Sequence, residues 1–417
     1  MGKTTDRLWQ QERGQTLLLF LLFMIVLFTF LGLGIDLGFA YISRAKLSKA
    51  VDAACLTGMR SLSQGIPQAT VVASNAFAAN YGSSGRDVAP PNPTITFSSV
   101  NGNTVLDVTA TVNINTFFLR ALPALPFYSG QSWKTLTVGS TAEATRANLI
   151  MALVLDDSGS MRNNGGSGAL PGAVSSFISQ FSPTIDQLAM VTFDSAGSVA
   201  VPMEYNFVTD INNAVNAMTF PSTTCSDQGL TNGFAQILNT PVTANENVIQ
   251  VLVFFTDGMA NTFNYTFNCG SRNIDYNDNL YDPTTGNSSS TGCTIPGTIS
   301  SINPLNGNLT ANAVNTSSCD AMHTEAENRA EWIAWLARNQ NYIIYSIGMG
   351  SPGDTGECNG DFPVLNPVFL EDVANTTDSQ TYQSTQQAGD YAVAADAGQL
   401  EQVFQTIASK ILLRLTK

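Results

Sequence analysis

The chain has 417 residues, enough for two or three domains at ~100–200 residues each. Only 12% of its residues are charged, about half of the ~25% usual in soluble proteins, and the formal net charge is −14. An acidic chain of this kind is not expected to bind nucleic acid, which requires a basic face. Residues 1–60 carry a net +3 and residues 151–417 a net −18, so the two ends are predicted to lie in different environments.

A membrane-spanning helix is predicted close to the N-terminus. Leu17–Gly34 is a run of 18 residues without a charge, and about 20 such residues cross the hydrocarbon core of a bilayer. Three basic residues precede the run. They place residues 1–15 in the cytoplasm, a single span at residues 16–42 in the membrane, and the bulk outside. A cleaved signal peptide is the alternative, but no A-x-A-like site follows the run.

Asp36 is the only charge within the predicted span. Its place near the outer end favours solvation at the membrane interface. The alternative is an intramembrane contact with a helix of a partner protein, because a charged side chain inside a bilayer needs a partner.

Residues 43–147 are predicted to form a pilin-like α+β region. Apolar residues recur at spacings of three and four, which predicts a helical stalk to about residue 80 with an interruption at Gly65–Pro67. The period then changes to two, and Asn-Gly at 101–102 is a strong hairpin signal. A small antiparallel sheet is therefore expected, with strands at 94–99, 104–114 and 134–147.

The pattern from residue 148 onward predicts an α/β fold, a doubly wound domain over residues 148–417. Leu149–Leu155 and Val248–Phe255 are fully apolar runs, as expected of parallel strands buried on both faces. The other expected strands are 188–193, 198–203 and 342–349, and the expected helices are 171–181, 209–218, 229–238, 324–339 and 397–415.

An insert interrupts this domain at about 259–322. It is rich in Asn, Ser, Thr and Gly and carries three of the six cysteines, so we expect a surface insert stapled by disulfides. A zinc site is not expected, because the chain has no C-x-x-C pair and a single histidine. The pairing is left open, and one of the five cysteines in the domain must remain unpaired. Cys55, in the stalk, is interpreted as a buried thiol, with an intermolecular disulfide as the alternative.

A metal site with oxygen ligands is predicted where the two apolar strands end. The first strand leads into Asp156-Asp157-Ser158-Gly159-Ser160, a D-x-S-x-S sequence at the edge where doubly wound folds bind ligands. The second leads into Thr256-Asp257-Gly258, and Thr224, with Thr223 beside it, precedes a helix. Such hard oxygen donors suit Mg²⁺ best, with Ca²⁺ and Mn²⁺ as alternatives, and a partner's carboxylate can complete the shell. The predicted set is Asp156, Ser158, Ser160, Thr224 and Asp257.

These residues resemble the von Willebrand factor A domain and its metal-ion-dependent adhesion site. The D-x-S-x-S sequence, the threonine before a Gly-Leu helix and the T-D-G sequence occur in that family's order, and the resemblance covers about 148–415. It implies that the Ser158, Ser160 and Thr224 hydroxyls ligate the ion and that the two aspartates act directly or through water. A family member that keeps these loops without binding metal is the alternative.

The N-terminal part resembles the TadE/TadG-like proteins of tight-adherence (Flp) pilus assembly. The resemblance rests on Arg13-Gly14-Gln15, the apolar helix and the segment at 34–62, and it covers about 13–63. Processed pilin-like proteins of that system carry a glutamate five residues after the cleavage glycine, where this chain has Leu19. A permanent membrane anchor is therefore expected. The resemblance implies that this anchor lies in the inner membrane of a bacterium, with the bulk of the chain in the periplasm or at the cell surface.

A binding protein is favoured over an enzyme. His323 is the only histidine and no G-x-S-x-G sequence is present, so no nucleophile–base pair is visible. The expected function is metal-bridged binding of an acidic side chain on a partner protein, including components of a Tad/Flp pilus. The alternatives are a surface adhesin independent of any pilus, and a structural envelope protein with an inactive metal site.

Overall fold

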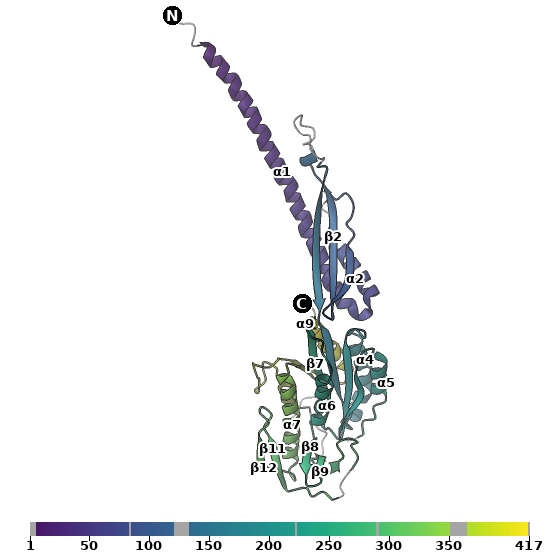
Figure 1. Cartoon of the computed structure of the whole chain (residues 1–417). Coiled ribbons are helices and arrows are strands. Elements are labelled where there is room, and N and C mark those ends of the chain that lie inside the picture. Colours follow the sequence, from purple (N-terminus) through teal and green to yellow (C-terminus); the bar gives the residue numbers. More distant parts are fainter. Residues whose placement is uncertain are drawn as a thin grey trace. The chain divides into compact units, whose positions relative to one another are not determined.

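The computed structural model of the chain divides into two compact units (Figure 1). The N-terminal unit comprises Met1–Ser99 and Thr104–Thr145, and the C-terminal unit comprises Val100–Asn103 and Arg146–Lys417. The structure describes residues 6–82, 85–120, 133–221, 223–288, 292–350 and 365–415, with side chains from residue 16 onward.

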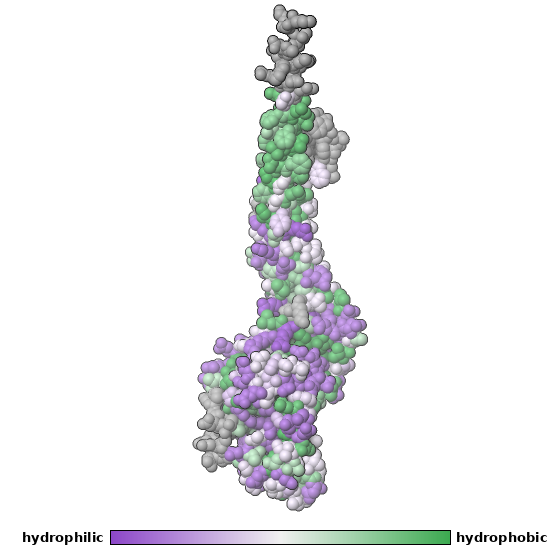
Figure 2. Space-filling model, turned by 90° about the vertical axis from the view of Figure 1, so that its left-hand side faces the viewer, coloured by the Kyte–Doolittle hydropathy of each residue, from purple (hydrophilic) through white to green (hydrophobic). Residues whose placement is uncertain are grey.

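The N-terminal unit is built on one long helix, α1 (Asp6–Arg60). Its first half exposes apolar side chains, as Figure 2 shows for one face, and by length and composition alone Thr16–Gln64 could cross a membrane. The predicted interruption is confirmed, because a 3₁₀ turn and Gly65 (φ 88°) end the first helix. Helix α2 (Ile66–Asn80) then packs on α1 through buried Ala69, Ala73 and Phe77.

A three-stranded sheet completes this unit, in the order β1-β2-β3. Asn101 and Gly102 both have positive φ (51° and 81°), the backbone that a two-residue hairpin turn requires, so the predicted hairpin is confirmed. Burial alternates along β2, whose even-numbered residues from 108 to 114 are buried, and this face forms the core with the helices. The strands are β1 (Thr94–Val100), β2 (Asn103–Asn115) and β3 (Thr135–Arg146).

Asp36 is neither solvated nor directed at a partner helix, so both sequence-based interpretations were wrong. Its side chain is buried, and its carboxylate accepts hydrogen bonds from the backbone N–H groups of Phe117, Phe118 and Leu119 at 2.8–2.9 Å. The Arg86 guanidinium lies 3.7 Å from the same carboxylate. A residue 81 positions away in sequence was not a foreseeable partner, because pattern analysis detects only local spacing.

The C-terminal unit contains a six-stranded sheet in the order β14-β13-β7-β4-β5-β6. All neighbours whose pairing is described run parallel except edge strand β6, which is antiparallel to β5, so the predicted α/β fold is confirmed. Strand β14 was not predicted, because its five residues are too short a signal beside longer loops. The strands are β4 (Asn148–Asp156), β5 (Gln187–Phe193), β6 (Gly197–Glu204), β7 (Val248–Thr256), β13 (Ile343–Met349) and β14 (Asp390–Ala394).

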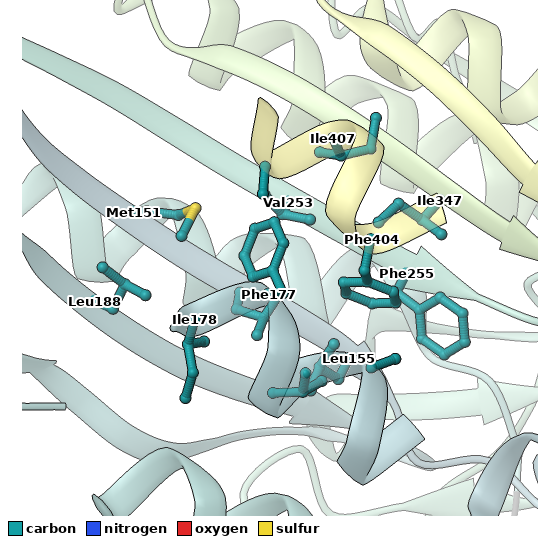
Figure 3. Close-up of a cluster of buried hydrophobic side chains, with 14 of the residues drawn as sticks. Met151, Leu155, Phe177, Ile178, Leu188, Val253, Phe255, Ile347, Phe404 and Ile407 are labelled. Atoms are coloured by element: carbon teal, nitrogen blue, oxygen red, sulfur yellow. The ribbon is translucent and has the colours of Figure 1, made fainter. Parts of the chain in front are cut away.

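Helices cover both faces of this sheet, and β4 is therefore buried along its whole length. Its odd-numbered residues pack with α4 (Gly166–Ile178), α5 (Val208–Asn216) and α9 (Leu400–Leu415), in the cluster drawn in Figure 3. Its even-numbered residues pack on the opposite layer. That layer consists of α6 (Ser226–Leu238), α7 (Cys319–Asn339) and α8 (Pro367–Ala374), of which α8 was not predicted.

The insert between β7 and α7 is folded rather than irregular. It forms a three-stranded sheet, a β-hairpin and a small apolar core of its own that includes Phe263, Ile274 and Val314. The disulfide prediction is confirmed for Cys269–Cys293, whose Cα atoms are 5.2 Å apart. The strands are β8 (Thr262–Phe267), β9 (Gly270–Asp275), β10 (Leu280–Tyr281), β11 (Thr298–Ile302) and β12 (Leu309–Asn315).

Three of the other four cysteines lie in the described residues. Cys319 is also disulfide-bonded, whereas Cys55 and Cys225 are buried free thiols. Cys55 is therefore the buried thiol that its apolar setting indicated, and Cys225 is an unpaired cysteine of the domain. Cys358 lies outside the described residues.

Arg146 and Asp186 form a buried ion pair in the C-terminal unit. Arg146 donates two hydrogen bonds to the Asp186 carboxylate at 2.8 and 2.7 Å, and Ser182 and Leu149 also donate to it through their N–H groups. Asp186→Ala strands a buried guanidinium and is expected to lower the free energy of unfolding by ~3–5 kcal/mol in urea denaturation.

The half-exposed pair of Lys410 and Asp390 provides the matched control. Asp390→Ala is expected to cost less than ~1 kcal/mol, because exposed ion pairs contribute little. Equal losses in the two variants would contradict the importance assigned to Asp186.

Candidate metal centre

The loop after β4 is fixed by Asp156, which is fully buried. One of its carboxylate oxygens accepts the Ser158 N–H at 2.8 Å, and the other accepts the Thr256 hydroxyl of neighbouring β7 at 2.6 Å. The next residue, Asp157, donates its N–H to the Phe193 carbonyl at the end of β5. Three adjacent strand ends therefore hold the turn that carries the two serines.

The serine hydroxyls and Asp257 converge above this turn. Ser158 Oγ and Ser160 Oγ are 2.9 Å apart, and Ser160 donates to Asp257 Oδ1 at 2.7 Å. Four of the five residues singled out in the sequence, Asp156 included, thus lie in one cluster. The other Asp257 oxygen accepts the Asn164 side-chain amide at 2.6 Å.

Asn164 was missed by the sequence analysis. It lies just past the one-turn helix α3 (Ser160–Asn163), which turns the chain back toward Asp257. In the sequence it stands in Asn-Asn-Gly-Gly, a composition typical of turns, so nothing marked it as a neighbour of the carboxylate.

Thr224 lies beside the loop that follows β7, where its backbone is fixed. Its N–H donates to the Asn261 side chain at 2.7 Å, and its carbonyl accepts the N–H groups of Asn261 and Thr262. No described hydrogen bond links its buried hydroxyl to the serines or to Asp257. The hydroxyl of adjacent Thr223 is buried without a hydrogen-bond partner in the described structure.

The three oxygens are close enough together to contact one small divalent cation. Two neighbouring ligands of an octahedral ion bound at 2.0–2.1 Å lie about 2.9 Å apart. The hydrogen-bonded oxygens of Ser158, Ser160 and Asp257 are 2.9 and 2.7 Å apart, so little movement is needed for them to share an ion. Across the described parts of the chain, no group of three Asp, Glu, His or Cys side chains could hold a metal ion. A cation at this edge would therefore bind hydroxyl and carboxylate oxygens together.

The two carboxylates of the cluster are electrostatically unfavourable in the absence of a cation. Burial, and then the nearby charge of Asp257, raises the pKa of Asp156 to about 7. Burial also raises the pKa of Asp257, against the lowering effect of its hydrogen bonds from Ser160 and Asn164. A positive charge at this edge would remove the repulsion between the two carboxylates.

Comparison with protein-family models assigns two parts of the chain. Residues 151–259 match the model described as von Willebrand factor type A domain. The C-terminal unit contains a von Willebrand factor A domain. Residues 14–61, within α1 and its continuation, match the model described as Flp pilus-assembly TadE/G-like. Both family resemblances seen in the sequence are confirmed.

Solved structures similar to this chain include pilus proteins. The pilus adhesin SpaC of Lactobacillus rhamnosus GG is 16% identical to this chain, with a TM-score of 0.43. The match covers 78% of this chain and 35% of the SpaC chain. The vWF domain of the type V pili tip protein Mfa5 from Porphyromonas gingivalis is 16% identical, with a TM-score of 0.41, covering 65% of this chain and 97% of its own.

This chain therefore spans about a third of the length of SpaC. At such identities and TM-scores, the likeness carries no argument about function. A search of curated proteins found no match to the chain.

The raised pKa of Asp156 predicts how the stability of the metal-free von Willebrand domain depends on pH. Because the folded pKa is raised from 3.8 to about 7, the protonated carboxyl favours the folded state. That contribution is complete below about pH 4 and is lost as the pH rises through about 7. Melting in EDTA between about pH 4 and 7 should therefore show a Tm that falls with pH, and Asp156→Asn should make the slope less steep. Part of the slope should remain, because burial also raises the pKa of Asp157 to about 6 and that of Glu327 to about 7. The same slope in the variant would contradict this assignment.

Proposed function

We propose that the von Willebrand domain binds a divalent cation through Asp156, Ser158, Ser160, Thr224 and Asp257. Mg²⁺ is the preferred ion, with Ca²⁺ and Mn²⁺ as alternatives, because the donors are all hard oxygens. The observation that carries the proposal is the convergence of Ser158, Ser160 and Asp257 at the carboxyl edge of the sheet.

The bound cation is proposed to bind an acidic side chain of a partner protein. The donors of the site are mainly neutral hydroxyls, and Asp156 already uses both oxygens to accept hydrogen bonds from Ser158 and Thr256. The ion would therefore retain positive charge for an anionic ligand. A carboxylate of the partner protein would supply the negative charge that the ion attracts. The proposed function is therefore adhesion, and no enzymatic step is proposed.

The proposed setting is the bacterial envelope. The TadE/G-like match and the exposed apolar half of α1 support a membrane span. The basic residues that precede the apolar run favour a single span with the N-terminus in the cytoplasm and the bulk outside the inner membrane. We assign residues 1–15 to the cytoplasm, 16–42 to the span, 43–147 to a pilin-like stalk and 148–417 to the von Willebrand domain. Pilus components are the proposed partners.

Melting experiments test the cation site. If Mg²⁺ binds the folded domain only, a concentration 100-fold above Kd should stabilise it by ~2.7 kcal/mol, which raises Tm by several degrees. Asp257→Ala should abolish this increment. Asp210→Ala, which removes an exposed carboxylate at the start of α5, should retain it. An equal increment in all three proteins would refute the site.

The requirement for the cation in partner binding needs a separate experiment. The immobilised chain is exposed to envelope proteins of the bacterium that produces it, in Mg²⁺ and in EDTA, beside the Asp257→Ala variant. Capture of a pilus component is expected in Mg²⁺ only and by the unsubstituted chain only. Capture that is indifferent to both EDTA and the substitution would overturn metal-bridged adhesion and favour a structural envelope protein with an inactive site.

A further inference from the structure

The end of the small sheet in the N-terminal unit lies beside the apolar part of α1. We use the name β2–β3 tip for the described residues there, Thr116–Leu119 and Trp133. The Thr116 hydroxyl donates to the Trp133 carbonyl, so the two sides of the tip are joined. The Asp36 carboxylate of α1 binds the three N–H groups of Phe117, Phe118 and Leu119, which attaches the tip to the helix.

The tip reaches into the uncharged run of α1. Phe118 packs on Gly32, where an added Cβ would lie only 2.5 Å from the Phe118 ring. Gly32 stands two residues before Gly34, the end of that run, so at 1.5 Å per residue the ring contacts the helix about 3 Å inside the run. A membrane that surrounds the run would therefore also surround the end of the tip.

The side chains of the tip have the chemistry of a membrane interface. Phe117, Phe118 and Trp133 are 62%, 37% and 42% exposed. Aromatic side chains of water-soluble proteins are more often buried in the interior. Aromatic residues gather at the level of lipid headgroups. Arg120 and Lys134, both exposed, flank the rings and could reach anionic lipid phosphates.

The hydrogen bonds between Asp36 and the tip provide partners for polar groups that would otherwise be unfavourable near a membrane. A carboxylate in or near the hydrocarbon is unfavourable, and so are backbone N–H groups without a partner. Here the three N–H groups satisfy the carboxylate, and the carboxylate satisfies them. Arg86 adds a compensating positive charge at 3.7 Å, with its guanidinium 3.7 Å from the centre of the Phe39 ring.

We propose that the β2–β3 tip inserts into the outer interface of the same bilayer that α1 crosses, with Asp36 as the residue that positions it. The bilayer surface is thus a second binding partner of the N-terminal unit. The inference rests on the proposed membrane span. The stalk would contact the membrane at two places, the helix and the tip.

Fluorescent labels on the full chain in vesicles of phosphatidylcholine and phosphatidylglycerol test the insertion. Single cysteines are introduced at exposed positions, Phe117→Cys in the tip, Phe23→Cys in the run and Val71→Cys on α2, and are labelled with an environment-sensitive dye. Val71 is a distant control, because α2 packs at Gly58, 26 residues and about 39 Å along α1 from Gly32. The free thiols described in the chain are buried, which favours labelling of the new sites.

Lipids that carry a nitroxide near the headgroup should quench most of the emission at position 117, and those that carry it deeper should quench position 23. Position 71 should stay unquenched. If position 23 is quenched and position 117 is not, the tip insertion is wrong while the membrane span stands. If neither is quenched, the proposed span itself fails.

The positioning role of Asp36 has its own readout. In an Asp36→Ala background, the label at position 117 should lose most of its quenching while the label at position 23 keeps it. Asp52→Ala, on an exposed position of α1, should leave both unchanged. Unaltered quenching at 117 in the Asp36→Ala protein would overturn this role.

Discussion

The parallel register of β4 and β7 is the constraint on which the candidate site depends. Leu155 pairs with Phe255, so Asp156 and Thr256 end their strands side by side, and the hydrogen bond between their side chains reflects that alignment. Asp257 then follows at the same edge as the two serines. A shift of one residue would exchange the two faces of β4. Because each face packs against its own helix layer, such a shift would disrupt both layers.

The close approach of α6 strengthens this constraint. Gly233 lies against β4 so tightly that an added Cβ would be 2.5 Å from the Val154 side chain. Helix α6 begins just after Thr224, so the packing that sets the helix also sets the threonine beside the loop after β7. The geometry of the polar edge is therefore imposed by apolar contacts below it.

The sequence was most informative where one physical signal dominated. The fully apolar runs at β4 and β7 and the change of period at β1–β3 predicted the strands, and the D-x-S-x-S sequence predicted the cluster at their edge. Signals that depend on distant partners were not accessible. The sequence around Asn164 indicates a turn, but helix α3 brings the Asn164 side chain to Asp257. The sequence around Asp36 indicates a solvated carboxylate, but a loop 81 residues away covers it. The insert strands lack apolar alternation because their core is small.

The buried thiol of Cys225 has a consequence for the chemistry of an oxidising compartment. It is fully enclosed at the start of α6, and burial together with the Asp227 carboxylate that accepts its hydrogen bond raises its pKa. Thiol–disulfide exchange needs an accessible thiolate, and this sulfur provides neither access nor ionisation. An odd cysteine can therefore coexist with the Cys269–Cys293 bond in one folded unit, because native packing blocks the disulfide exchange that the unfolded chain would permit.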